Sequence, residues 1–207
     1  MTEILTPKAL ADASGDTGDD QFVRLGEQLF QWRDYTPIPL VLLLLFVARP
    51  TVFSATLGMC LIVFGEAIRL YSVAFIGSVS RTRTPGSGGS LITTGPFSIV
   101  RNPLYVGNFF ITFGVTLYGG QLGFVVIAML LFAFQYYCIV RFEETQLERK
   151  FPEEYVAYME AVPRWFPSPL PSMHELQWPA SFSEAIWSER RTFMAIAAVI
   201  TLLLLKS

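Results

Sequence analysis

Five apolar runs follow one another along this 207-residue chain, and they constrain its fold more than any other feature. They cover residues 35–49, 51–77, 104–118, 122–140 and 192–205. A helix needs about 20 apolar residues to cross a bilayer, and it satisfies its own backbone polar groups there. The first run is short for a crossing and fits a helix with little tilt or a thinned bilayer. The order predicts an all-α, polytopic membrane protein with about five transmembrane helices.

Composition and charge exclude several other classes of protein. The chain is 52% hydrophobic and 15% charged, which is not the profile of a soluble domain. Its net charge of -2 excludes binding to nucleic acid, which needs clustered Lys and Arg. Cys60 and Cys138 stand in apolar runs and are expected to be small core residues without a disulfide. The single histidine, His174, cannot build a multi-ligand metal site, and the glycines at 85–90 indicate a loop, not a nucleotide fingerprint.

The segment before the first apolar run has two parts. Residues 1–20 are polar and acidic, lack the basic start of a signal peptide, and are expected to form a loose tail. In 21–35, Phe22, Leu25, Leu29 and Trp32 recur at helical spacing, which predicts an amphipathic helix on the membrane surface. We therefore divide the chain into an N-terminal tail and interfacial helix, 1–34, and a membrane domain, 35–207.

The distribution of basic residues predicts the orientation, since loops rich in Lys and Arg stay in the cytoplasm. Basic residues gather in the loops after the second and fourth runs, at Arg81, Arg83, Arg101, Arg141, Arg149, Lys150, Arg164, Arg190 and Arg191. The N-terminus is then cytoplasmic and the C-terminus lies on the opposite side. Arg49 and Lys206 are exceptions, because this orientation puts these two basic residues on the non-cytoplasmic side. We expect a multi-pass protein of a bacterial inner membrane.

Two polar stretches lie where this topology puts the cytoplasmic edge of the membrane. One is "TTGPFSIVRNPLYVGNFF" at 93–110 and the other is "RFEETQLERKFPEEYVAYMEAVPRWFP" at 141–167. If they fold together, Arg101 and Asn102 form one wall of a pocket, and Glu143 and Glu144 with two tyrosines form the other. Such a pocket suits a zwitterion, because a guanidinium pairs with a carboxylate and a carboxylate pairs with an ammonium.

A further charged pair stands inside the second apolar run. Glu66 and Arg69 are three residues apart there, and they are expected either to pair with each other or to line a polar interior. A structural pair and a second wall of the pocket both fit this spacing.

The two polar stretches also carry a family resemblance. "GPFSIVRNPLYVGN" and "EETQLERKFPEEYVAYMEAVPRWFP" resemble the two signatures of the isoprenylcysteine carboxyl methyltransferase and phospholipid methyltransferase superfamily, over residues 91–167. The resemblance implies methyl transfer from S-adenosylmethionine to a membrane-embedded acceptor, with a cofactor pocket that faces the cytoplasm. It also implies that no metal is required.

Site residues follow from the resemblance position by position. It implies cofactor contacts at Thr94, Gly95, Pro96, Arg101, Asn102, Tyr105, Gly107, Glu143, Glu144, Tyr155 and Tyr158. Arg164 is implied to hold the loop or the acceptor, and Glu144 is the candidate for accepting a proton or orienting the acceptor. Asn102 stands where the family usually has histidine, so an acid or base role there is lost.

Other interpretations remain open at this point. An NADPH-dependent reductase of sterol type shares a related helical architecture, and a non-catalytic lipid-binding protein would bind no cofactor. The arginines also fit a role as membrane anchors, the glutamates fit a solvated helix end, and the tyrosines fit an aromatic belt at the membrane surface. The acceptor is left as a prenylated cysteine carboxylate, a phospholipid amine, a small thiol or another isoprenoid-like lipid.

Overall fold

The computed structural model describes residues 18–76, 90–167, 177–179 and 182–206. These residues form seven α-helices and one 3-10 helix, with no strand among them, so the predicted all-α class is confirmed. The elements are α2 (Gly18–Trp32), α3 (Pro37–Val47), α4 (Val52–Ile76), η2 (Gly95–Ser98), α5 (Pro103–Tyr118), α6 (Leu122–Lys150), α7 (Pro152–Ala161) and α8 (Ser183–Lys206). The predicted tail over 1–17, Arg81, Arg83, His174 and most of the predicted loop at 85–90 lie outside the described residues.

Two of these helices are long and apolar enough to cross a membrane: α4 with 25 residues and α6 with 29. At about 1.5 Å per residue, α6 is longer than the roughly 30 Å hydrocarbon core. It therefore carries the polar residues after position 140 beyond the apolar run in one continuous helix. The shorter α3 is apolar throughout its 11 residues. Five crossings remain a prediction.

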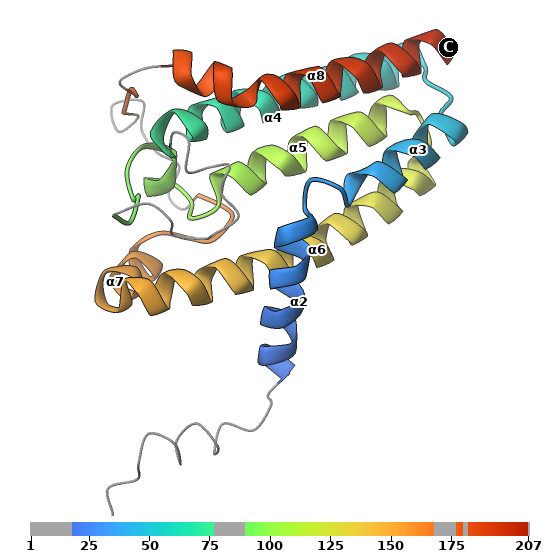
Figure 1. Ribbon diagram of the computed structural model, residues 1–207. Coiled ribbons are helices and arrows are strands. Elements are labelled where there is room, and N and C mark those ends of the chain that lie inside the picture. The colour runs from blue at the N-terminus through green and yellow to red at the C-terminus, as the bar shows by residue number, and fades with distance from the viewer. Residues whose placement is uncertain (1–17, 77–89, 168–176, 180–181, 207) are drawn as a thin grey trace, which may run out of the picture.

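The long helices lie alongside one another, with α5 between α4 and α6 and with α8 against α4 (Figure 1). Glycines allow the close approach of α4 and α5. A Cβ atom at Gly58 would lie 2.6 Å from the Gly114 carbonyl oxygen, and one at Gly107 would lie 2.8 Å from the Gly65 carbonyl oxygen. Gly107 therefore lies at a helix crossing, where any larger side chain would push the two backbones apart.

The N-terminal helix α2 crosses α6 (Figure 1). The predicted amphipathic helix is present. The residues that it buries against α6 are neighbours of the predicted apolar stripe: Gly26 lies against the backbone of Cys138, and Phe30 is only 2% exposed. Phe22 and Trp32, on the predicted stripe, are exposed. Contact with a membrane surface remains a prediction for them.

The two cysteines differ from each other. Cys138 is fully buried, as expected. Cys60 is exposed, so its prediction as a core residue was wrong. The apolar run that contains Cys60 faces outward at this position of α4, where a small apolar thiol suits a lipid-facing surface as well as a core.

A hydrophobic core joins the helices at the end that carries the two tight turns. It consists of Leu44, Ala48, Ile62, Tyr118, Phe124, Ala128, Ile200 and Leu203. The turns are tied together by a hydrogen bond from the Arg49 amide to the Gly119 carbonyl, 2.8 Å long. Lys206 donates to the Leu45 and Phe46 carbonyls at the C-terminal end of α3. Its ammonium thus has a structural partner at the end of a helix, where cations are favoured.

Prolines set the start of the helices that frame the opposite end. Pro103 opens α5 and Pro152 opens α7, at the position where the missing N–H costs nothing. The helix α7 ends at Ala161, and Pro163 follows two residues later. These breaks bring the loop after α7 back over the start of α5.

Candidate active site

The two polar stretches meet in the structure. The Arg101 amide donates to the Pro163 carbonyl at 2.8 Å, and the Tyr158 hydroxyl donates to the Phe97 carbonyl at 2.6 Å. The Asn102 side-chain amide donates to the Arg164 carbonyl at 3.3 Å. The predicted convergence of residues 93–110 with 141–167 is therefore confirmed.

Glu144 lies between two arginines. Its Oε1 accepts from Arg101 Nε at 3.3 Å, Arg101 Nη2 at 3.1 Å and Arg164 Nε at 3.0 Å, while its Oε2 accepts from Arg164 Nη2 at 2.6 Å. Arg101 also donates through Nη1 to the Met159 and Val162 carbonyls at 2.9 and 2.8 Å. The predicted placement of Arg101 and Glu144 on opposite walls was wrong. A carboxylate and a guanidinium this deeply buried pair directly, because each would otherwise lose its hydration without compensation.

Two tyrosines of α7 pack beside this ion-pair network. Tyr155 is 1% exposed and Tyr158 is 8% exposed, and they form a cluster with Val162. Burial raises the pKa of the Tyr155 phenol, and the negative charge of Glu144 raises it further. Burial also raises the pKa of Tyr158, although Arg101 opposes this shift. Both phenols therefore stay neutral at physiological pH and act as hydrogen-bonding groups, not as anions.

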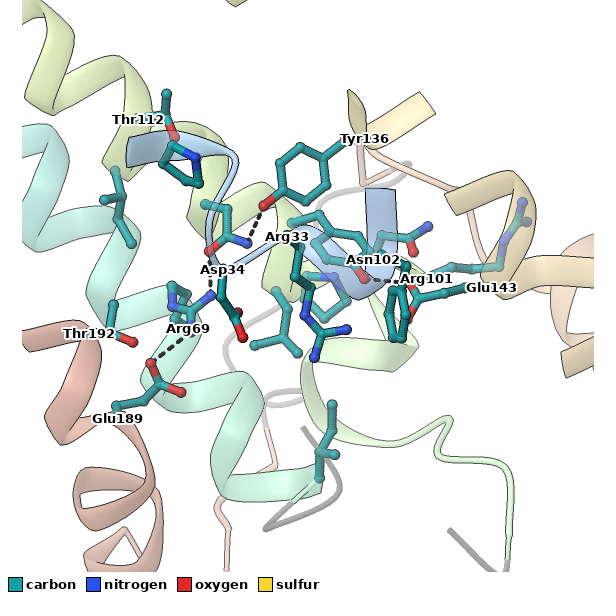
Figure 2. Close-up of a pocket in the computed structure, with 18 of the residues that line it drawn as sticks. Arg33, Asp34, Arg69, Arg101, Asn102, Thr112, Tyr136, Glu143, Glu189 and Thr192 are labelled. Atoms are coloured by element: carbon teal, nitrogen blue, oxygen red, sulfur yellow. Dashed lines mark hydrogen bonds and ion pairs between the residues drawn. The ribbon is translucent and has the colours of Figure 1, made fainter. Parts of the chain in front are cut away.

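Glu143 points to a different neighbour from that of Glu144. Its Oε2 accepts from the Tyr105 hydroxyl at 2.5 Å (Figure 2). The Tyr105 ring lies 4.8 Å from the Tyr136 ring, centroid to centroid. Adjacent positions on α6 thus place one carboxylate in an ion-pair network and the other beside a phenol.

A second polar group joins α4, α5, α6 and α8 (Figure 2). Arg69 Nη2 lies 2.7 Å from Oε2 of Glu189, which is 1% exposed, and Nη1 donates to Asn108. The Asn108 amide in turn donates to the Tyr136 hydroxyl at 2.9 Å. Of the two arrangements expected for Arg69, the structure has the polar interior, since its ion-pair partner is Glu189. The Glu66 carboxylate oxygens are buried and have no hydrogen-bond partner among the described residues.

A cavity of about 670 Å³ connects the two polar groups. Seven of the predicted site residues line it: Arg101, Asn102, Tyr105, Glu143, Glu144, Tyr155 and Tyr158. A set of apolar residues also lines it and comes mainly from α3, α5 and α8, at Leu40, Val41, Leu44, Ile111, Val115, Ala195, Ile196 and Val199. The cavity therefore has a polar end made by the two signatures and an apolar end made by the helices that flank them.

The other predicted residues lie outside the wall of this cavity. Thr94 precedes η2, and its carbonyl accepts a hydrogen bond from the Phe97 amide. Gly95 has a φ of 60° and lies against the Phe75 ring, where a side chain would be both strained and obstructed. Pro96 lines a separate, almost wholly apolar cavity of about 520 Å³. Gly107 lies at the α4–α5 crossing and Arg164 lies behind Glu144.

The structure also adds polar residues to the wall that the sequence did not point to. Arg33 and Asp34 come from the turn after α2, Asn108 from α5, and Glu189 and Arg191 from α8. Glu189 carried one usable signal, because it is a charged residue three positions before an apolar run. Helix packing alone brings Arg33 and Asp34 to the cavity.

Ligand chemistry follows from these side chains. The wall offers guanidinium, carboxylate, amide and phenol groups next to an apolar channel, so it suits a zwitterionic molecule beside a lipophilic one. No group of three His, Cys, Asp or Glu residues is arranged to hold a metal ion in the part of the chain that the structure describes.

Comparison with known families agrees with the two signatures. Residues 53–154 match the family model for phospholipid methyltransferase. The matched segment contains α4, α5, α6 and the loop that carries Arg101 and Asn102. The predicted family resemblance is therefore confirmed, and the match ends at residue 154, before Tyr155, Tyr158 and Arg164 of the second signature.

Curated relatives match a similar share of the chain. The nickel-cobalt-cadmium resistance protein NccN of Alcaligenes xylosoxydans xylosoxydans is 33% identical over 112 residues, which cover 54% of this chain and 49% of the relative. The cobalt-zinc-cadmium resistance protein CzcN of Cupriavidus metallidurans is 30% identical over 112 residues, which cover 54% and 48%. The chain thus spans about half the length of the curated relatives it matches. No solved structure matches it significantly.

Proposed function

We propose that this chain, of which residues 53–154 match the phospholipid methyltransferase family, transfers a methyl group from S-adenosylmethionine to a lipophilic acceptor. The family match supports a membrane methyltransferase in general. The cofactor, the acceptor and the site are our proposal. We place the reaction in the cavity of about 670 Å³ between the signature segments and α8.

One observation carries this proposal: a single cavity has a polar end and an apolar end. Signature residues that are distant in sequence, such as Asn102 and Tyr155, line the polar end. Residues such as Leu40 and Ile196 line the apolar end. Its volume lies within the range of about 300–1,000 Å³ typical of ligand pockets. A polar cofactor and a lipophilic acceptor can therefore meet within one cavity.

The residues of the polar end fit the proposed cofactor. Asn102 can donate and accept hydrogen bonds, and Tyr155 and Tyr158 offer aromatic faces and phenols that stay neutral at physiological pH. Glu143 supplies negative charge for an ammonium or a sulfonium, whereas Glu144 is already paired with two arginines. Arg101 already donates to Glu144 and to two backbone carbonyls, so we assign it a positioning role that holds the loop after α7 against the start of α5.

When bound, S-adenosylmethionine supplies a methyl group on a sulfonium, and a lone pair of the acceptor forms the new bond to this carbon as the carbon–sulfur electrons pass to sulfur. The protein then mainly has to align the acceptor and exclude water. A carboxylate acceptor needs no base, whereas an amine must first lose its proton. Glu143 is the better candidate to take that proton. It accepts one hydrogen bond, from Tyr105, while the oxygens of Glu144 are engaged by two guanidiniums.

The orientation predicted from the basic residues belongs to the same proposal. The polar end then faces the cytoplasm, where a water-soluble cofactor can enter, and the apolar end lies within the bilayer of a multi-pass inner-membrane protein. An acceptor can in that case reach the cavity from the lipid phase.

Calorimetry in detergent tests the proposed function directly. We expect S-adenosylhomocysteine to bind, NADPH not to bind, and labelled methyl groups to appear in lipid extracts incubated with the protein. Asn102→Ala should weaken S-adenosylhomocysteine about five- to tenfold by removing hydrogen bonds of the polar end. Glu148→Gln, at an exposed position of α6 outside the cavity, is the matched control. Binding of NADPH alone would support a reductase, and binding of neither molecule would support a lipid-binding protein.

A further inference from the structure

Helix α8 presents one stripe of residues to the cavity. Thr192, Ile196 and Val199 follow at spacings of four and three, so they share one face of the helix. Arg191 stands next to Thr192 and lines the same cavity. The stripe therefore begins with a cation and continues with apolar side chains toward the hydrophobic core.

Arg191 differs from the other charged residues near it. It is exposed, and it makes no hydrogen bond or ion pair with any part of the chain that the structure describes. Glu189, the acidic residue two positions before it, is already paired with Arg69 at 2.7 Å. Its neighbour Arg190 donates to the Trp187 carbonyl and lies 4.0 Å from the centroid of the Trp187 ring, outside the cavity wall. Arg191 is thus a cation at the cavity that has no ion-pair partner among the described residues.

The position of Arg191 separates it from the signature residues. Figure 2 shows Thr192 and Glu189 on the opposite side of the view from Arg101 and Glu143, so the start of α8 lies across the cavity from these signature residues. Apolar residues of α3, including Leu40 and Val41, line the same cavity. A molecule with a charged head and an apolar chain matches this arrangement of a cation followed by apolar wall.

We infer that Arg191 binds an anionic headgroup of the lipophilic acceptor, whose apolar chain lies along Ile196, Val199 and the facing side of α3. This inference rests on the proposed function, since it assigns the apolar part of the cavity to the acceptor. An arginine suits the task because its planar donors match the oxygens of a carboxylate or a phosphate. Carboxylates and phosphates both carry negatively charged oxygens, so the negative charge of the headgroup is the feature that Arg191 recognises.

The test uses the full chain in a non-ionic detergent with three twelve-carbon probes: laurate, dodecyl phosphate and the neutral dodecanol. We expect the wild type to bind at least one anionic probe about five- to tenfold more tightly than dodecanol, a modest preference because the guanidinium is solvent-exposed. Arg191→Gln should abolish this preference, and Arg191→Lys should retain part of it. Arg190→Gln should leave it unchanged, because that side chain carries the same charge one residue away but does not line the cavity. The comparison of laurate with dodecyl phosphate shows which anion is preferred.

Two results would overturn the inference: an anion preference that survives Arg191→Gln, or one that falls equally in Arg190→Gln. An equal loss in Arg190→Gln would mean that Arg190 and Arg191 attract anions only through their positive charge at the membrane edge. S-adenosylhomocysteine affinity is measured on the same preparations, and it should be equal in wild type and Arg191→Gln. Absence of that binding in the wild type refutes the proposed function, whereas unchanged cofactor binding with an unchanged anion preference refutes the role of Arg191 alone.

Discussion

Glu144→Gln provides the sharpest test of how the two signature segments are held together. The substitution keeps the size of the side chain but removes the negative charge that two guanidiniums share. A glutamine can accept hydrogen bonds through its one remaining carbonyl oxygen, but its amide group presents donors to Arg164 where the carboxylate presented an acceptor. The variant should therefore leave two cations without their counter-charge.

The magnitude follows from the burial of the three side chains. Arg101 and Glu144 are each 10% exposed at the side chain, while Arg164 is 33% exposed. Breaking a fully buried pair by removing one partner costs about 3–5 kcal/mol. Arg101 keeps its two backbone carbonyls, and solvent screens Arg164, so we expect a loss of about 2–4 kcal/mol in the free energy of unfolding.

Denaturant titration in detergent, monitored by circular dichroism, measures this free energy. Glu143→Gln is the matched control, because it removes the same charge at the adjacent position and leaves an oxygen that can still accept from Tyr105. The double variant Glu144→Gln with Arg164→Gln should recover part of the loss, since one unpaired cation is removed. If Glu144→Gln lies within about 0.5 kcal/mol of Glu143→Gln, the range of ordinary surface substitutions, the ion-pair network does not hold these segments together.

Three further predictions concern other parts of the molecule. Arg69→Gln should destabilise the protein by about 3 kcal/mol, because it removes the guanidinium that lies 2.7 Å from the buried Glu189 carboxylate. Adding Glu189→Gln should restore part of this loss in the same titration, and purely additive losses would contradict the pairing. With both native cysteines replaced, a cysteine at Glu154 should react with an impermeant reagent from the cytoplasmic side only and one at Gln121 from the other side only, and reversed labelling would overturn the orientation. Because burial raises the folded-state pKa of Tyr158 above the ordinary 10.0, the stability it contributes is complete below about pH 10 and is lost as the pH rises above that value. The stability of Tyr158→Phe should fall less steeply in this range, and equal slopes would exclude the shift.

The sequence alone determined the class of the fold and the resemblance to the family that residues 53–154 match. Apolar runs can be recognised locally, because a helix in a membrane satisfies its own backbone and depends only on the residues within it. The prolines at 103 and 152 set helix starts for the same local reason. The two signatures also predicted that residues 93–110 and 141–167 meet, and the contacts between Arg101 and Pro163 confirm this.

Only the tertiary structure decided which charged groups pair. The sequence placed Arg101 and Glu144 across a pocket and offered Glu66 as a partner for Arg69, whereas the structure pairs Arg101 with Glu144 and Arg69 with Glu189. Local spacing gives each ion a nearby candidate, but the partner is the opposite charge that packing brings within bonding distance as both lose water. The approach of α8 to α4 is a long-range contact of this kind, and it has no signal in either segment. The shape of the cavity, and the place of Arg191 in its wall, depend on that same helix packing.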